Sequence, residues 1–194
     1  MKTQNLLLIL LLFTINCSPI RDYPEGLANC ESIRIKNQKS NPGKYIYTSP
    51  QCLIGYHIPN FEAHTFSGDK IHSKSLEGKP SIINFWFIDC KPCVEEIPLF
   101  NDLVAEIDPT RVNFIAIGRD GMKEQEKFLK KTPWNFEHLD NGELLIENVF
   151  QHSWGYPKTF LIDKKGIIVS VYGGLAFKDR MSLLKSKIVV LLED

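Results

Sequence analysis

The chain has 194 residues, of which 43% are hydrophobic and 24% are charged. This length corresponds to one domain with a short extension, and the composition excludes a disordered, collagen-like or coiled-coil body. The 23 basic and 23 acidic side chains cancel to a formal net charge of zero. Because binding of nucleic acid depends on excess positive charge, this balance argues against a nucleic-acid partner. The cysteines number five, an odd count that suits redox chemistry, a crosslink or a lipid anchor.

The amino terminus has the pattern of an export signal. Lys2 precedes an apolar run at residues 6–13. The run is too short to cross about 30 Å of hydrocarbon as a helix, which takes about 20 residues, but it fits the apolar part of a secretory signal peptide. We therefore expect residues 1–16 to be a signal peptide and the mature protein to work outside the cytoplasm, where disulfides persist.

Cys17 follows directly after this segment. Its position resembles that of the lipidated cysteine in bacterial lipoproteins, which predicts an anchor through Cys17 on the periplasmic side of a bacterial membrane. Thr14 and Asn16 depart from such signals, which usually have Leu three residues before the cysteine and a small residue immediately before it. The alternative is ordinary signal cleavage nearby, with no special role for Cys17.

Residues 17–53 are expected to form a tether and an amino-terminal extension with loose order and a short strand at residues 44–48. Prolines interrupt this region, and no hydrophobic period runs through it. Cys30 and Cys52 flank it, and in an oxidising compartment they are the natural pair for a structural disulfide, worth on the order of 3 kcal/mol. The alternative is two free, buried thiols.

Residues 54–194 are expected to form the folded domain, with apolar runs of strand length and apolar positions at helical spacing. The predicted strands lie at residues 61–66, 70–72, 81–88, 111–118, 158–163 and 166–172. The predicted helices lie at residues 94–107, 123–131, 143–150 and 179–192. The last two strands are joined by a short turn and should be antiparallel, while the order of the other elements indicates an α/β fold. We therefore expect a central mixed sheet flanked by helices.

Cys90 and Cys93 lie three positions apart where a buried strand ends and a helix begins. Unpaired N–H groups and the positive end of the helix dipole stabilise an anion there, so they should lower the pKa of Cys90 and favour its nucleophilic thiolate. We expect Cys90 to attack a partner disulfide and Cys93 then to attack Cys90 and release the reduced partner. Such a redox disulfide needs no metal or other cofactor.

The spacing of this cysteine pair is also compatible with half of a zinc site or with chance. A zinc site would need a second pair of ligands at suitable spacing, whereas the five histidines lie in separate segments. Chance is an alternative because five cysteines form ten pairs, so that one pair at this spacing is not rare.

Two segments carry a family resemblance. Residues 84–98, NFWFIDCKPCVEEIP, resemble the active-site segment of thioredoxin-fold proteins, above all of the exported, membrane-tethered TlpA/ResA-like group. Residues 155–163, GYPKTFLID, resemble the Gly-x-Pro-x-x-Phe-Leu-Ile-Asp segment of the same family. The resemblance covers about residues 54–194 and implies a thioredoxin-like fold and disulfide exchange with partner proteins.

The resemblance also implies further site residues. Pro157 would be a cis proline that packs against the cysteine pair, keeps metal away and presents the backbone of Tyr156 to an extended partner peptide. Trp154 lies close to Pro157 in the sequence and is the aromatic residue most suited to recognise the same partner. Glu96, one helical turn past Cys93, would tune the thiols and relay a proton. The alternative for Glu96 is a solvated helix residue.

Two positions depart from the family pattern. Asp89 stands where the family usually has Trp or another uncharged residue, and its carboxylate opposes thiolate formation at Cys90, while Lys91 favours it. Asn84 takes the place of the buried Asp of cytoplasmic thioredoxins, which leaves Glu96 as the substitute acid.

Three function classes follow. The first is an exported, membrane-anchored thiol–disulfide oxidoreductase that works as a monomer, reduces partner disulfides and receives electrons from a membrane donor. The second is a thiol peroxidase of the same broad fold, although residues 83–90 lack the Pro-x-x-x-Thr/Ser-x-x-Cys setting of a peroxidatic cysteine. The third is a non-catalytic module that binds a partner or copper.

Overall fold

The computed structural model describes residues 21–44, 46, 48–175 and 179–193. The predicted signal peptide and Cys17 lie outside these residues, as do residues 45 and 47 of the predicted strand at 44–48. Residues 44, 46 and 48 are not in strand conformation. Among the residues that the structure describes, no helix combines the length and the apolar character needed to cross a membrane.

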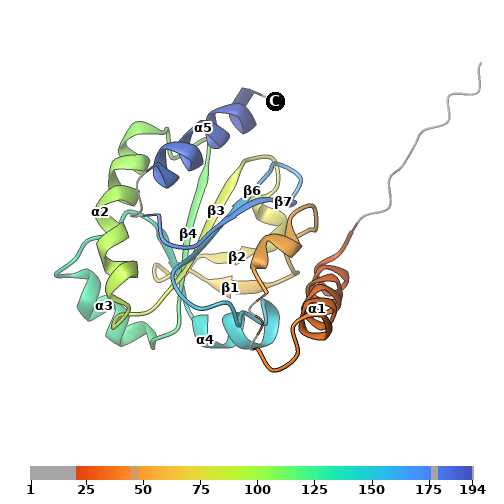
Figure 1. The fold of residues 1–194 in the computed structure, drawn as a ribbon. Coiled ribbons are helices and arrows are strands. Elements are labelled where there is room, and N and C mark those ends of the chain that lie inside the picture. Colours follow the sequence, from red (N-terminus) through yellow and green to blue (C-terminus); the bar gives the residue numbers. More distant parts are fainter. Residues whose placement is uncertain (1–20, 45, 47, 176–178, 194) are drawn as a thin grey trace, which may run out of the picture.

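The domain is built on a five-stranded mixed sheet with the strand order β5-β4-β3-β6-β7 (Figure 1). Its strands are β3 (Ser81–Trp86), β4 (Asn113–Gly118), β5 (Glu137–Leu139), β6 (Lys158–Ile162) and β7 (Ile168–Tyr172). The first three are parallel, whereas β6 is antiparallel to β3 and β7 is antiparallel to β6. The predicted α/β fold with an antiparallel edge is therefore confirmed. Strand β5 was not predicted, because three residues are too few to show a period.

Helices cover both faces of this sheet. One face packs against α2 (Lys91–Glu106), α5 (Arg180–Glu193) and the end of α3 (Met122–Leu129). The other face packs against the 3-10 turn η1 (Pro50–Leu53) and the short helix α4 (Gly142–Leu144), which continues as a π-helical turn, η3 (Leu145–Val149). A further 3-10 turn, η2 (Ser73–Leu76), precedes β3. Strand β3 lies at the centre, and all six of its residues are buried, as its apolar run predicted.

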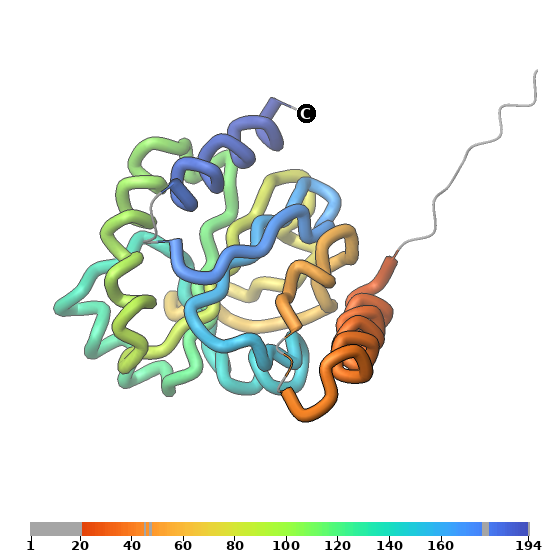
Figure 2. Tube along the Cα trace, in the orientation of Figure 1, coloured from red at the N-terminus to blue at the C-terminus, as the bar shows by residue number. Residues whose placement is uncertain are grey.

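The helix α1 (Tyr23–Ser40) occupies much of the region that was expected to be loosely ordered. That prediction was wrong, because α1 shows almost no amphipathic pattern and depends on its cap and a few contacts. The Asp22 side chain accepts a hydrogen bond from the backbone N–H of Glu25 at 2.9 Å, which caps the helix. The Tyr23 hydroxyl donates to the carbonyl of Phe150 at 2.9 Å. The trace in Figure 2 shows α1 at the periphery, on the opposite side of the sheet from α2.

A disulfide joins α1 to η1. Cys30 and Cys52 are bonded, with their Cα atoms 5.2 Å apart. Gly26 lies on the same face of α1, and a Cβ atom there would meet the Tyr56 ring at 2.9 Å. The absence of a side chain at Gly26 therefore allows α1 to approach the domain closely, and the disulfide holds it there.

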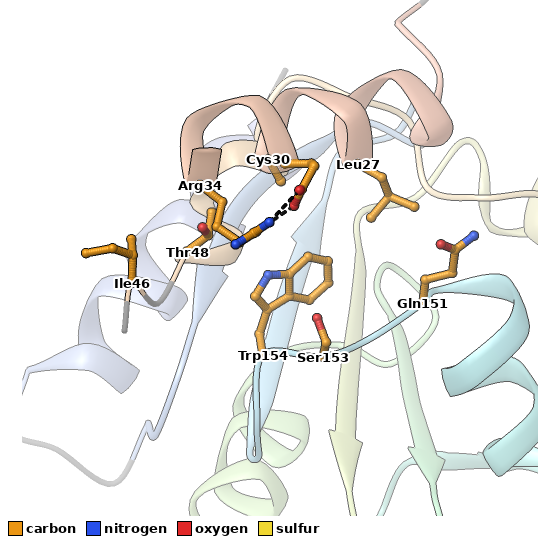
Figure 3. A pocket seen from close by; sticks show the side chains of 9 residues that line it. Leu27, Cys30, Arg34, Ile46, Thr48, Gln151, Ser153 and Trp154 are labelled. Atoms are coloured by element: carbon orange, nitrogen blue, oxygen red, sulfur yellow. Dashed lines mark hydrogen bonds and ion pairs between the residues drawn. The ribbon is translucent and has the colours of Figure 1, made fainter. Parts of the chain in front are cut away.

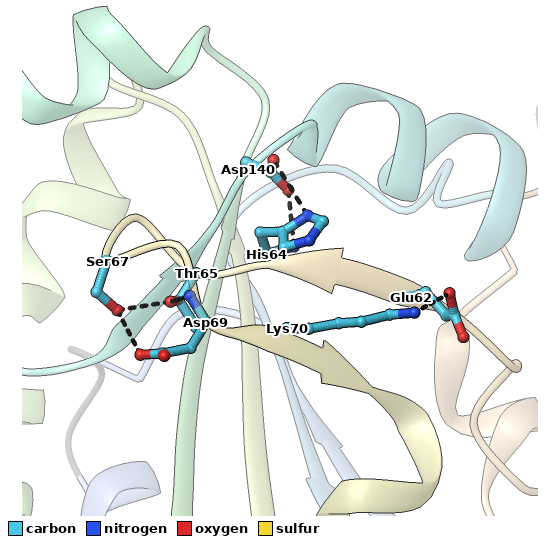
Figure 4. Close-up of polar contacts among 7 residues, drawn as sticks. All are labelled: Glu62, His64, Thr65, Ser67, Asp69, Lys70 and Asp140. Atoms are coloured by element: carbon cyan, nitrogen blue, oxygen red, sulfur yellow. Dashed lines mark hydrogen bonds and ion pairs between the residues drawn. The ribbon is translucent and has the colours of Figure 1, made fainter.

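A small hairpin of β1 (Glu62–His64) and β2 (Lys70–His72) packs on the face of the sheet that η1 and η3 cover. Lys70 pairs with Glu62 at 2.9 Å across the hairpin, and Figure 4 shows the polar side chains around it. The Asp140 carboxylate accepts a hydrogen bond from the backbone N–H of His64 at 3.0 Å, and the Asp140 N–H donates to the His64 carbonyl at 2.8 Å. These bonds attach β1 to the end of β5.

Candidate active site

The cysteine pair lies at the amino end of α2, where the chain leaves the central strand β3. Cys90 is the N-cap residue of α2, and its sulfur accepts a hydrogen bond from the backbone N–H of Cys93 at 3.3 Å. The two cysteines form a disulfide with their Cα atoms 5.2 Å apart. The solvent-exposed fraction is 5% for Cys90 and 2% for Cys93, so Cys90 is the more accessible of the two. When the pair is reduced, the same N–H group and the helix end stabilise a thiolate at Cys90.

The charged neighbours of Cys90 are directed into solvent. Asp89 and Lys91 are both exposed, and the Lys91 ammonium lies 3.8 Å from the Glu95 carboxylate. Salt and water screen exposed charges strongly, so neither neighbour acts on the sulfur as directly as the helix end does.

The loop before β6 meets the cysteine pair at the same edge of the sheet. The peptide bond between Tyr156 and Pro157 is cis, and Pro157 is buried. Phe85 near the end of β3 is paired with Lys158, which follows Pro157 directly, so the two segments that carry the family resemblance lie side by side here. The Tyr156 ring packs against Phe87 with 5.2 Å between ring centroids. Tyr156 thus borders the same apolar cluster as Cys90 and Cys93.

Glu96 is fully buried, with 0% of its surface exposed, although it belongs to a helix with an exposed face. Its carboxylate accepts a hydrogen bond from the backbone N–H of Leu175. It also acts on Lys158, where burial lowers the pKa of the ammonium and the negative charge of Glu96 raises it. Glu96 is therefore an internal acid one turn beyond Cys93 and not a solvated helix residue.

Trp154 is the one predicted partner-binding residue that the structure directs elsewhere. Its side chain points toward α1 and lines a cavity of about 270 Å³ together with Leu27, Cys30 and Arg34 (Figure 3). The His152 ring lies between it and the site, 5.6 Å from the Trp154 ring and 5.0 Å from that of Tyr156.

His152 supports the cis-proline loop, a role that the sequence did not indicate. Its ring stacks on Phe85 at 4.8 Å, and Nε2 forms a hydrogen bond with the carbonyl of Gly155 at 3.1 Å. Burial lowers the pKa of His152 to about 4, so the ring is neutral at pH 7.

The turn after β4 adds two residues that were not predicted from the sequence. The Arg119 guanidinium lies over the Phe87 ring at 4.6 Å and near the Tyr156 ring at 6.0 Å. The Asp120 carboxylate accepts a hydrogen bond from the backbone N–H of Ile88 at 2.7 Å, which orders the segment before Cys90. The sequence position of Arg119 and Asp120 could have indicated them as site residues, because charged residues that directly follow a buried parallel strand lie at the carboxyl edge of the sheet.

No group of three or more His, Cys, Asp or Glu side chains suited to a metal ion occurs in the described part of the chain.

Comparison with known proteins places this arrangement in a family. The model of the AhpC/TSA family matches residues 54–171. The chain belongs to the AhpC/TSA family. Within it, the chain is similar to the thiol-disulfide oxidoreductase ResA of Bacillus cereus, with 35% identity over 138 residues, which cover 70% of this chain and 78% of that protein. The thioredoxin-like protein YneN of Bacillus subtilis is 28% identical over 131 residues, which cover 66% of this chain and 75% of that protein.

The fold agrees with this assignment. A secreted Mycobacterium tuberculosis disulfide oxidoreductase homologous to E. coli DsbE superposes with a TM-score of 0.56 at 24% identity, covering 68% of this chain and 96% of that one. The similarity to ResA shows that the chain is a thiol–disulfide oxidoreductase of the ResA type, and the superposition shows its thioredoxin-like fold. The matched region of the AhpC/TSA model begins at residue 54, so it does not include α1 or the Cys30–Cys52 disulfide.

Proposed function

We propose that this AhpC/TSA-family member is an exported, membrane-anchored enzyme that reduces disulfides in partner proteins through Cys90 and Cys93. The observation that carries the proposal is the position of Cys90 as the N-cap of α2, with the Cys93 N–H on its sulfur. This arrangement favours a thiolate at the more accessible cysteine and keeps the second sulfur within reach.

The exchange proceeds in two displacements. The Cys90 thiolate attacks one sulfur of a partner disulfide, so that a Cys90–partner bond forms, the partner disulfide breaks and one partner thiolate leaves. Cys93 then loses its proton and attacks Cys90, so that the Cys90–Cys93 bond forms and the second partner thiolate leaves. Both partner thiolates take up protons. Two electrons pass from the cysteine pair to the partner, and a membrane electron donor returns two electrons to the pair.

Glu96 is the proposed acceptor for the proton of Cys93. It lies one helical turn further along α2, and its burial withholds it from bulk water. Removing bulk water strengthens the interaction of a carboxylate with nearby protons and charges, and general-base assistance is typically worth 10²–10⁴-fold in rate. The Lys158 ammonium offsets the cost of a buried negative charge.

The partner is proposed to bind as an extended peptide along the cis-proline loop. Tyr156 offers its backbone beside Pro157, and such strand addition gives affinity without demanding one partner sequence. Phe87 and Arg119 flank Tyr156 and supply an apolar and a cationic surface. Trp154 contributes indirectly, since its ring packs against His152, which in turn supports this loop.

The anchor through Cys17 and the periplasmic location are supported by the apolar run at residues 6–13 and by the cysteine that follows it. A Cys17→Ser variant tests this point. We expect metabolic labelling with radioactive palmitate to mark the wild type and not the variant, and the variant to leave the membrane fraction. Equal labelling of both proteins would exclude Cys17 as the anchor.

Trapping tests the thiol chemistry. A Cys93→Ser variant expressed in its own cell should hold partners as mixed disulfides on Cys90, visible as reducible high-mass bands. The matched control is Cys90→Ser/Cys93→Ser, which should trap nothing. If both proteins capture the same bands, or neither captures any, the proposed exchange is wrong. Reduction of insulin by the reduced wild-type enzyme, with loss of this activity in the control, tests the direction.

Substitution of Glu96 tests the proton step. Glu96→Gln keeps the size and the acceptor for the Leu175 N–H, but it removes the base, so we expect release of a trapped model peptide to slow by about 100-fold at pH 7. The rate should recover as the pH rises and Cys93 ionises without help. Glu95→Gln is the control, because Glu95 is an exposed acid on the same helix. A similar rate and pH profile in both variants would remove Glu96 from the mechanism.

A further inference from the structure

A second pocket lies between η1, β7 and α5, and neither Cys90 nor Cys93 lines it. Its volume is about 470 Å³, and its lining includes the three basic side chains Lys158, Arg180 and Lys187. None of the lining residues, all of which the structure describes, is acidic. Such a concentration of positive charge in one cavity favours an anionic occupant.

Lys187 and Arg180, two of the basic side chains, each donate a hydrogen bond to a neutral acceptor. Lys187 donates a hydrogen bond to the Ser170 hydroxyl, and Arg180 donates to the carbonyl of Gly174 at 3.0 Å. A neutral acceptor orients an ammonium group without cancelling its charge. Lys187 therefore presents a fixed charge to the pocket.

Lys158 brings a third cation from the inner side. It is half-buried at the start of β6, and its ammonium lies 3.4 Å from the carbonyl of Pro157. Burial lowers its pKa, and the nearby Glu96 carboxylate raises it. An anion in the pocket would compensate the half-buried ammonium further.

Tyr172 provides the second, independent observation. It retains only 7% of its exposure and lines the pocket. Its hydroxyl has no hydrogen-bond partner of suitable geometry among the described residues. Burial raises the pKa of Tyr172, and the Ser170 hydroxyl lowers it in part. A buried hydroxyl without a partner costs free energy, and an acceptor in the pocket would remove this cost.

We propose that this pocket binds the phosphate group of a phosphate ester through Lys158, Lys187 and Tyr172. A phosphate oxyanion offers several acceptors and negative charge to donors of this kind. The volume lies in the range of about 300–1,000 Å³ that is typical of small-molecule pockets, which leaves space for an ester substituent. Ile54 and Leu183 line the same pocket and provide apolar contacts for it. The ester is either a soluble phosphate compound or the headgroup of an anionic phospholipid.

The test compares the full mature wild-type chain with Lys187→Gln, Tyr172→Phe and the control Lys185→Gln. Lys185 lies on the same helix but pairs with Glu106, outside the pocket. Binding is measured by calorimetry with inorganic phosphate at constant ionic strength, and by sedimentation with phosphatidylcholine vesicles that contain or lack phosphatidylglycerol. We expect wild type and Lys185→Gln to bind alike, and the two pocket variants to bind at least tenfold more weakly.

The two probes distinguish the sources of the phosphate. Saturable binding of inorganic phosphate that the pocket variants weaken supports a soluble ligand, and binding only to phosphatidylglycerol vesicles with the same sensitivity supports a headgroup. Absence of binding to both probes, or equal weakening by Lys185→Gln, would overturn the proposal. Near-UV circular dichroism shows that each variant is folded. A Cys90→Ser/Cys93→Ser chain should bind phosphate unchanged, because the site does not depend on disulfide exchange.

Discussion

The disulfide between Cys30 and Cys52 is the feature of the extension with the largest expected effect on stability. We consider its removal by Cys30→Ala/Cys52→Ala in a chain that already carries Cys90→Ser/Cys93→Ser. This background removes the redox disulfide from both proteins, so that neither its reduction nor an exchange with Cys17 contributes to the measured difference. The perturbation therefore reports on the connection between α1 and η1 alone.

The magnitude follows from the length of the closed loop. The bonded cysteines are separated by 22 positions, and the chain-entropy model assigns such a closure about 3 kcal/mol at 25 °C. For a chain of this size, 1 kcal/mol corresponds to about 2–4 °C in melting temperature, so we expect a decrease of about 10 °C. Helix α1 should open first, because only Tyr23, Gly26 and Cys30 of its residues are buried.

The assay is thermal unfolding followed by circular dichroism, together with hydrogen exchange of the amides of α1. The variant should lose protection in α1 well below the temperature at which the central sheet unfolds. A melting temperature within about 2 °C of the parent, with α1 still protected, would refute the reasoning, because the helix would then be held by its packing and cap alone.

Three further predictions concern the domain itself. His138 is buried and His152 is half-buried, and desolvation lowers the pKa of each from 6.5 to about 4. Between about pH 6.5 and 4 the unfolded chain therefore binds protons that the folded chain does not. As the pH decreases through this window, the free energy of unfolding should decrease by up to about 1.4 kcal/mol per pH unit for each histidine. A free energy of unfolding that does not change with pH in urea titrations would contradict this. Gly142→Ala places a Cβ atom against the Gly118 carbonyl oxygen, well inside van der Waals contact. The free energy of unfolding should decrease by about 1–3 kcal/mol in the same assay. Wild-type stability of this variant would show that the backbone moves to accommodate the methyl group without cost. Asp140→Ala removes the acceptor for the first strand of the hairpin and should cost about 1 kcal/mol, with loss of amide protection in β1 as the more specific readout.

Local patterns in the sequence were sufficient for the frame and the reactive centre. The apolar run at residues 81–88 predicts a central strand covered on both faces, and β3 occupies residues 81–86 of it. The helix after Cys90 is visible from its apolar period, and the spacing of Cys90 and Cys93 places both sulfurs at its first turn. These properties depend on neighbours within a few positions, so the sequence determined them by itself.

Tertiary contacts decided the rest. Helix α1 has few apolar positions, and its stability comes from a cap, a disulfide and contacts with residues more than twenty positions away. Three features of the site depend on which segments meet at one edge of the sheet. They are the burial of Glu96, the position of the Arg119 guanidinium over Phe87 and the orientation of the Trp154 side chain toward α1. The basic pocket likewise joins η1, β7 and α5, which are distant in the chain. The physical reason is the same in each case: burial and charge compensation are properties of long-range packing, and no local period records them.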